Sequence, residues 1–347
     1  MSKLRSWLVT LGLLGFFAGG CAAPATPAPA STPAPTLPPT LAPTLTVGPT
    51  ASAEAPPTAT LAPEAFRVVG YVTAATVLST LKYDKLTHIN YAFLIPNNDG
   101  TFAPLANLWK LDELAATADT HGVQVLISVG GWGWDKQFEA MAANPAARAQ
   151  FVSGLVDFVA AHNLDGADID WEYPDPGQSS QDFLALMQAL RFALPQDKLL
   201  TAAVVALGET GAGVPVEAFE LMDFVNLMAY DGDGPNHSSL EYAEAAITYW
   251  QGRGLPVEKT VLGVPFYARP SEVSYRKLVE ADPAATEVDE IEYFGAMVNY
   301  NGLATIRRKT KLALERAAGI MIWALEHDTN DGTSLLNAID ATIQAAE

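Results

Sequence analysis

Eight short apolar runs alternate with segments of helical character and constrain the fold of residues 65–347 more than any other feature. The runs are rich in β-branched and aromatic residues, as expected for parallel strands covered on both faces. Eight strands alternating with helices predict a (β/α)8 TIM barrel, and a doubly wound open sheet is the alternative. We place the strands at 66–72, 87–94, 123–129, 165–174, 199–207, 222–228, 260–266 and 319–325.

The segments between these runs carry the helical signals. Asn144 followed by Pro145 is a typical helix start, with an N-cap side chain and proline at the first position. Only residues 270–318 separate the last two strands, and their final third is itself helical. The chain therefore lacks room for a full α+β insertion domain there. The helices are predicted at 111–121, 145–162, 181–194, 240–253, 303–318 and 333–346.

Residues 1–21 have the composition of an export signal. Lys3 and Arg5 precede an apolar run that is too short for a comfortable membrane span, and Gly19, Gly20 and Cys21 follow. Small residues directly before the only cysteine resemble a bacterial lipoprotein signal, in which Cys21 becomes lipidated. Cleavage by the ordinary signal peptidase is the alternative. We expect an extracellular or cell-envelope location, with the membrane contacted only through this anchor.

Residues 22–64 form a linker between this signal and the barrel. They hold twelve of the 24 prolines, with alanine and threonine filling most other positions. Such a composition cannot bury a core and favours extended conformations. The organisation predicted is a signal at 1–21, a disordered linker at 22–64 and one catalytic barrel at 65–347.

The charge of the barrel region restricts its partners. It contains 37 acidic and 18 basic residues, which argues against binding nucleic acid or an anionic surface and suits a neutral polysaccharide. No cysteine remains for disulfides, and the histidines lack ligand spacing, so we expect no metal and no cofactor. We also expect a monomer. The five histidines are His88, His121, His162, His237 and His327.

The stretch 165–174 places four acids within an otherwise buried strand. Because side chains alternate along a strand, Asp168, Asp170 and Glu172 should share one face. Three carboxylates so placed repel one another, so at least one should hold a proton near neutral pH, as a general acid must. A solvated acidic strand fits poorly with the large apolar residues between them. A calcium-binding loop of the EF-hand type is a second alternative, but this stretch lacks the mid-loop glycine and the terminal glutamate of such a loop.

This Asp-x-x-Asp-x-Asp-x-Glu-Tyr-Pro pattern resembles the signature of glycoside hydrolase family 18, the chitinases and endo-β-N-acetylglucosaminidases. Two departures from the family pattern are visible. The segment Tyr267-Ala268-Arg269-Pro270 has alanine and proline where many members continue with glycine and a small polar residue, and the region between the last two strands is short. Further matching segments are Gly70-Tyr71, Tyr91-Ala92-Phe93, Ser128-Val129-Gly130-Gly131, Met228-Ala229-Tyr230-Asp231 and Trp323.

The resemblance and the chemistry agree on the roles of the acids. Glu172 should protonate the glycosidic oxygen and then act as base toward water. Asp170 lies too near Glu172 along the strand to be a separate nucleophile, so the resemblance implies that it holds the substrate's acetamido group. Asp168 would share a proton with Asp170. Asp165 would brace the turn that enters the strand.

The other expected site residues surround these acids. Tyr230 should form a hydrogen bond with the acetamido oxygen. Asp231 should contact the distorted sugar or adjust the proton affinity of Glu172, with a turn-forming role as its alternative. Trp323 should form an apolar floor under the sugar, with a core role as its alternative. At least one of Trp132 and Trp134 should line a subsite. The remaining expected residues are Tyr71, Phe93, Ser128, Gly131, Met228 and Tyr267, of which Tyr71 and Ser128 support rather than react.

Three functions fit these motifs. The first is a retaining chitinase that uses the substrate's acetamido group through an oxazolinium intermediate. The second is the same chemistry on protein-linked N-glycans, and the third is a non-catalytic chitin-binding barrel. Family members of the third kind usually lose the terminal glutamate, whereas Glu172 is present. The short segment between the last two strands predicts an open groove and endo-type cleavage of low processivity.

Overall fold

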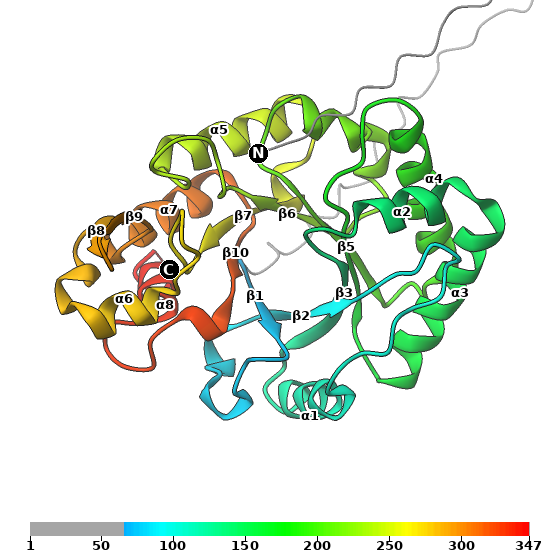
Figure 1. The fold of residues 1–347 in the computed structure, drawn as a ribbon. Helices are drawn as coiled ribbons and strands as arrows, with labels where there is room; N and C mark the ends of the chain where they lie inside the picture. Colours follow the sequence, from blue (N-terminus) through cyan, green and yellow to red (C-terminus); the bar gives the residue numbers. More distant parts are fainter. Residues whose placement is uncertain (1–65, 347) are drawn as a thin grey trace, which may run out of the picture. The chain divides into compact units, whose positions relative to one another are not determined.

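Eight parallel strands close into a barrel in the computed structural model, which describes residues 66–346 (Figure 1). Around the barrel the strand order is β1-β10-β7-β6-β5-β4-β3-β2, so consecutive strands are neighbours and the sheet has no open edge. The (β/α)8 prediction is confirmed over the open sheet. The strands are β1 (Arg67–Thr73), β2 (His88–Leu94), β3 (Gln124–Gly130), β4 (Gly166–Asp170), β5 (Leu199–Val205), β6 (Phe224–Met228), β7 (Thr260–Pro265) and β10 (Gly319–Trp323).

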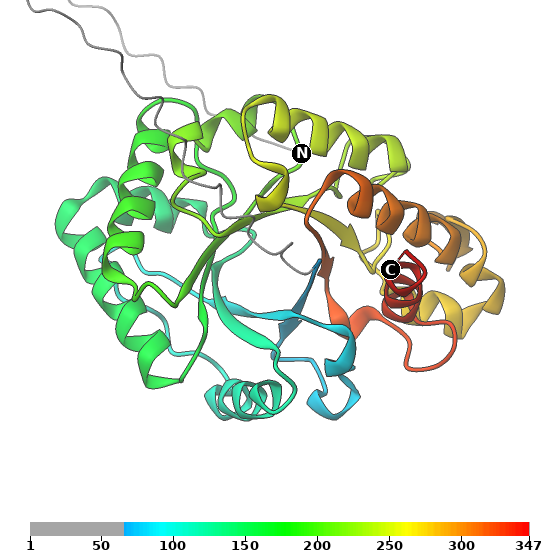
Figure 2. The same ribbon diagram turned by 180° about the vertical axis from the view of Figure 1, so that it is seen from behind.

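Helices ring the strands, as the view from behind also shows (Figure 2). Asn144 caps α3 by accepting hydrogen bonds from the amides of Ala146 and Ala147, as its sequence predicts. Two helices, α2 and α6, were not predicted because both are short. The α-helices are α1 (Leu108–Asp119), α2 (Asp135–Ala143), α3 (Pro145–Ala161), α4 (Gln178–Ala193), α5 (Leu240–Gly252), α6 (Tyr275–Ala281), α7 (Leu303–Arg316) and α8 (Leu335–Gln344). Within the described part of the chain, no helix is long and apolar enough to span a membrane.

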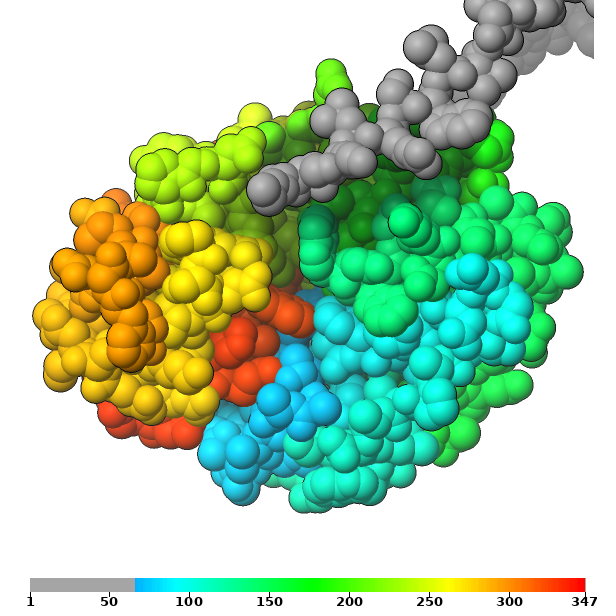
Figure 3. All heavy atoms as spheres, in the orientation of Figure 1, coloured from blue at the N-terminus to red at the C-terminus, as the bar shows by residue number. Residues whose placement is uncertain are grey.

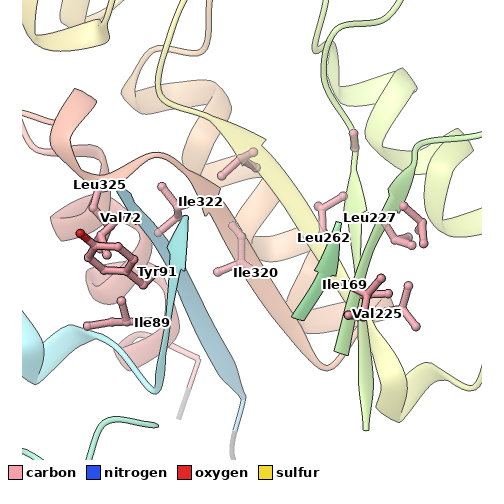
Figure 4. Close-up of a cluster of buried hydrophobic side chains, with 14 of the residues drawn as sticks. Val72, Ile89, Tyr91, Ile169, Val225, Leu227, Leu262, Ile320, Ile322 and Leu325 are labelled. Atoms are coloured by element: carbon pink, nitrogen blue, oxygen red, sulfur yellow. The ribbon is translucent and has the colours of Figure 1, made fainter. Parts of the chain in front are cut away.

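Side chains alternate between the two faces of the barrel wall. Those facing outward pack beneath the helices in one apolar layer (Figure 4). Those facing inward include Tyr71 and Asp168, which meet inside the barrel. Burial of these apolar side chains is the main stabilising contribution to such a fold. The outward layer in Figure 4 includes Val72, Ile89, Tyr91, Ile169, Val225, Leu227, Leu262, Ile320 and Ile322, and Leu325, from the short helical turn after β10, belongs to the same apolar cluster.

The segment between β7 and β10 is small, as expected. It contains α6, α7 and one antiparallel hairpin, β8 (Glu290–Tyr293) with β9 (Ala296–Asn299). The prediction that no full α+β domain is inserted here is therefore confirmed.

Several strand ends differ from the prediction by one or two residues, and the largest error is at the end of β4. β4 ends at Asp170, whereas the apolar pattern suggested a strand up to residue 174. Pairing with β5 stops at Ile169 and pairing with β3 stops at Asp170, after which the amide of Gly131 donates to the Asp170 carbonyl oxygen at 2.8 Å. Glu172 therefore stands in the loop beyond the strand. The predicted signal at 1–21, its Cys21 and the linker at 22–64 lie outside the described residues.

Candidate active site

The carboxyl ends of the strands surround a cavity of 740 Å³. Segments that follow β1, β7 and β10 meet on this face of the barrel, coloured blue, yellow and red in Figure 3. Ten of the predicted site residues line this cavity, although they come from seven different strands and their loops. They are Tyr71, Phe93, Trp132, Asp170, Glu172, Met228, Tyr230, Asp231, Tyr267 and Trp323.

Asp168 is fully buried beneath the cavity and is held by four donors from four strands. Burial raises the pKa of this carboxyl, and the hydrogen bonds oppose that rise. Among the described residues no hydrogen bond joins it to Asp170, so the predicted shared proton is not seen. Tyr71 and Ser128 support this acid, as expected. The donors are Tyr71 Oη at 2.7 Å, Ser128 Oγ at 2.8 Å, Thr201 Oγ1 at 2.6 Å and Asn226 Nδ2 at 3.4 Å.

Asp170 lies one layer nearer the cavity and is only 3% exposed. Its Oδ1 atom is buried without a hydrogen-bond partner. Burial first, and then the negative charges of Glu172 and Asp168, raise its pKa well above the usual range. The protonated form of this carboxyl is therefore favoured more than in an ordinary aspartate, and its Oδ1 is an acceptor free for a ligand in the cavity.

Glu172 is the outermost acid of the stretch and lines the cavity. Burial raises its pKa to about 7, a hydrogen bond with Tyr173 opposes this rise, and the charge of Asp231 adds to it. A carboxyl group that is half protonated near neutral pH can donate a proton and later accept one. The geometry thus supports the predicted acid–base role. Asp165, by contrast, accepts a hydrogen bond from the Val125 amide at 2.7 Å and so supports the turn that enters β4, as expected.

Asp231 is held ionised by cationic and neutral donors. Burial raises its pKa, but hydrogen bonds from Arg269, His237 and Tyr267 lower it far more, to below the usual range. Arg269 donates two hydrogen bonds to the Asp231 carboxylate, from Nε and from one Nη, both at 2.7 Å, and Tyr267 Oη donates a third at 2.6 Å. The residue also has a φ of 56°, so a turn conformation and an electrostatic role coexist. Its fixed negative charge helps to raise the Glu172 pKa.

Aromatic rings form the floor of the cavity. Trp323 stacks on Phe93 with ring centres 5.5 Å apart and contacts Tyr71 at the same distance. Trp132 is 79% exposed at the rim, 6.5 Å from the Tyr173 ring. Trp323 thus faces the cavity and is not solely a core residue.

Four predicted site residues of the described chain do not line the cavity: Asp168 and Ser128, which are described above, and Trp134 and Gly131. Trp134 precedes α2, so of the two tryptophans only Trp132 reaches the cavity. Gly131 has a φ of 86°, and a Cβ atom there would lie 2.6 Å from the Phe93 ring. It shapes the floor by letting Phe93 approach the backbone.

Sequence reasoning missed seven residues that line the cavity. Arg269 is the most consequential, because it fixes the charge of Asp231. Its only sequence signal was its place in the segment after β7, which was noted as a departure from the family pattern. Tyr173 belongs to the acidic family pattern but was not assigned to the site, and the rest carry no pattern of their own. Besides Arg269, the missed residues are Tyr173, Ala203, Val205, Tyr242, Glu272 and His327. Within residues 66–346, no group of three His, Cys, Asp or Glu side chains could hold a metal ion.

A closed (β/α)8 barrel with a proton-carrying glutamate and a second buried acid in the cavity at its strand ends defines the class of barrel glycosidases. The sequence pattern of Glycosyl hydrolases family 18 matches residues 67–328, and the chain belongs to this family.

Similar proteins agree with this assignment. Chitinase 63 of Streptomyces plicatus is 29% identical over 296 residues, which cover 69% of this chain and 48% of that protein. A chitinase-like effector of Moniliophthora perniciosa is 32% identical over 238 residues, 57% of this chain and 53% of its own. The chain thus spans about half the length of these relatives. The crystal structure of the GH18 chitinase ChiB of Flavobacterium johnsoniae superposes with a TM-score of 0.72 at 29% identity, covering 81% of this chain and 95% of that one.

Proposed function

We propose that this chain hydrolyses β-1,4 bonds of N-acetylglucosamine polymers as a retaining chitinase. The observation that carries the proposal is the pairing of Glu172, with its pKa raised to about 7, and Asp170, whose Oδ1 lacks a partner, in one cavity. The similar proteins include chitinases, which supports the same substrate. No observation favours a purely binding role, since the acid required for chemistry is present.

The proposed reaction begins with substrate-assisted displacement. The acetamido oxygen of the substrate attacks the anomeric carbon while Glu172 protonates the departing glycosidic oxygen. The carbon–oxygen bond to the leaving sugar breaks as the oxazolinium ring closes. Asp170 accepts a hydrogen bond from the N–H of this ring through its free Oδ1, and the positive charge that develops there lowers the pKa of this carboxyl. Water then attacks the anomeric carbon, Glu172 takes its proton, and the ring opens with net retention.

Asp231 is poorly suited to replace the acetamido group. A double displacement needs a carboxylate nucleophile about 5 Å from the acid, and inversion needs a base about 6.5–9.5 Å away. Asp231 is the only other acid of the predicted motifs at this cavity, and its two oxygens are already bound by Arg269, Tyr267 and His237. The substrate's own acetamido oxygen, tethered beside the reacting carbon, has the advantage of a large effective concentration.

The test uses purified protein and defined oligosaccharides. N-acetylglucosamine oligomers should be cleaved with the β-anomer formed first, as NMR can follow, and Glu172→Gln should lower turnover at least 10²-fold. Cellulose oligosaccharides, which lack the acetamido group, should not be cleaved. Cleavage of those oligomers, or the inverted anomer as first product, would contradict the mechanism. Release of glycans from a high-mannose glycoprotein, with chitin oligomers untouched, would replace chitin as the substrate.

The product profile and the location are further parts of this proposal. The small segment between β7 and β10 supports endo-type cleavage, so early products from a long soluble substrate should be mixed in length. A profile dominated by disaccharide from the start would contradict this. Lipidation of Cys21 is expected from the sequence alone, and mass spectrometry of the envelope fraction would detect it. A mature N-terminus beyond Cys21 would refute the anchor.

A further inference from the structure

A buried lysine lies behind the loop that carries Asp231. Lys309 belongs to α7, and its side chain has no exposed surface. Its Nζ donates to the Ser238 carbonyl at 2.7 Å, to Ser238 Oγ at 2.6 Å and to Asn301 Oδ1 at 2.7 Å. All three partners are neutral, although buried lysines are rare unless they are paired with an acid. This arrangement therefore calls for an explanation beyond packing.

The hydrogen bonds continue from Ser238 toward the cavity. Ser238 Oγ donates to the Ala229 carbonyl at 2.8 Å, and Ala229 directly precedes Tyr230 and Asp231. The same loop is closed by the Gly232 amide, which donates to the His237 carbonyl at 2.9 Å. Lys309 is thus two hydrogen bonds away from the backbone that places two residues of the active site.

The geometry matches the charged form of the amine. An ammonium group has three N–H donors, and the three acceptors lie within 2.7 Å of Nζ. The charged groups that act on it are Glu241 at the start of α5, Asp289 before β8 and its neighbour Arg308 on α7. On the side of the loop, Asp231 and His237 lie beyond Ser238. None of these charged groups forms a hydrogen bond with Lys309 Nζ in the described part of the chain.

We propose that Lys309 is a positioning residue for the hydrolysis proposed above, on which this inference rests. Its ammonium group holds Ser238, Ser238 holds the Ala229 carbonyl, and that tether fixes Tyr230 and Asp231 relative to Glu172. Misplacement of such groups by about 1 Å can cost on the order of 10² in rate.

The tether depends on the proton of Lys309. A neutral amine has only two N–H donors for three acceptors, so Ser238 would have to turn its hydroxyl hydrogen toward Nζ and release Ala229. Burial lowers the Lys309 pKa to about 7, with Asp289 and Glu241 opposing this and Arg308 adding to it. Loss of the proton therefore falls in the same pH range as the ionisation of Glu172.

The kinetic test compares pH profiles on N-acetylglucosamine oligomers. In the wild type, kcat should fall above pH 7 more steeply than one ionisation allows. Lys309→Gln, which keeps two donors but cannot titrate, should lower kcat about tenfold at pH 6 with little change in KM and leave a single-ionisation slope. Lys311→Gln, an exposed lysine on the same helix, should match the wild type. An unchanged slope in Lys309→Gln would show a purely structural role and overturn the proposal.

A second arm does not depend on turnover. In the Glu172→Gln background, the Tyr230 and Asp231 amide NMR signals should titrate with the midpoint of the Lys309 side chain. Adding Ser238→Ala should abolish that response. Failure of the two amides to follow Lys309 would overturn the coupling, even if Lys309→Gln did not fold. Inactivity of the wild type on chitin oligomers would count against the proposed function, while this arm would still decide the role of Lys309.

Discussion

Replacing Glu172 by glutamine should stabilise the folded chain at alkaline pH while removing activity. The carboxyl has a pKa of about 7 in the folded chain, against 4.5 for the ordinary group. Below about pH 4.5 it is protonated in both states and contributes nothing to the pH dependence. As the pH rises to 7, the unfolded carboxyl ionises freely whereas the folded one resists, so the wild type loses stability.

The size of this effect follows from the two pKa values. A tenfold change in proton affinity is worth about 1.4 kcal/mol, so the gap from 4.5 to about 7 corresponds to about 3 kcal/mol. Glutamine resembles the protonated acid in shape and never ionises. Glu172→Gln should therefore raise the free energy of unfolding by about 3 kcal/mol at pH 8.5 and leave it unchanged at pH 4.

Urea unfolding at both pH values measures this difference directly. Glu220→Gln, an exposed glutamate for comparison, should change stability little at either pH. A Glu172→Gln protein no more stable than the wild type at pH 8.5 would refute the raised pKa. An equal gain at pH 4 would show that packing, and not proton binding, is responsible.

Three further predictions test other parts of the site. Arg269→Met should lower the free energy of unfolding, measured with urea, by about 1–2 kcal/mol at pH 7. This loss should shrink below about pH 4, because the lowered Asp231 pKa gives stability that disappears as Asp231 is protonated. An equal loss at pH 3 would argue against the ion pair. Trp323→Ala should lower kcat/KM about tenfold on chitin oligomers, with the exposed Trp109→Ala as control, and equal effects would exclude a floor role. Gly131→Ala should destabilise the fold by about 1–3 kcal/mol. Gly133→Ala should destabilise it less, because Gly133 also has a positive φ but has open space around a Cβ atom. Equal shifts of the melting temperature would mean that the contact with Phe93 is unimportant.

The sequence alone determined the barrel and its central acids, because both depend on local geometry. Apolar strands alternating with helices have few compact solutions, and closure into a barrel is one of them. The acids of 165–174 lie within one short segment, so alternation along the chain already placed Asp168 and Asp170 on one face. The family pattern then supplied the roles that this spacing left open.

Tertiary structure decided what depends on residues far apart in the chain. Asp168 meets Tyr71, 97 residues away, and Asp231 meets Arg269, 38 residues away. Neither pairing has a local signal, since each requires a definite register between strands and the closure of the barrel. The same applies to Lys309, whose partner Ser238 is 71 residues away. The pKa values follow from burial and neighbouring charge, so they too are properties of the folded barrel.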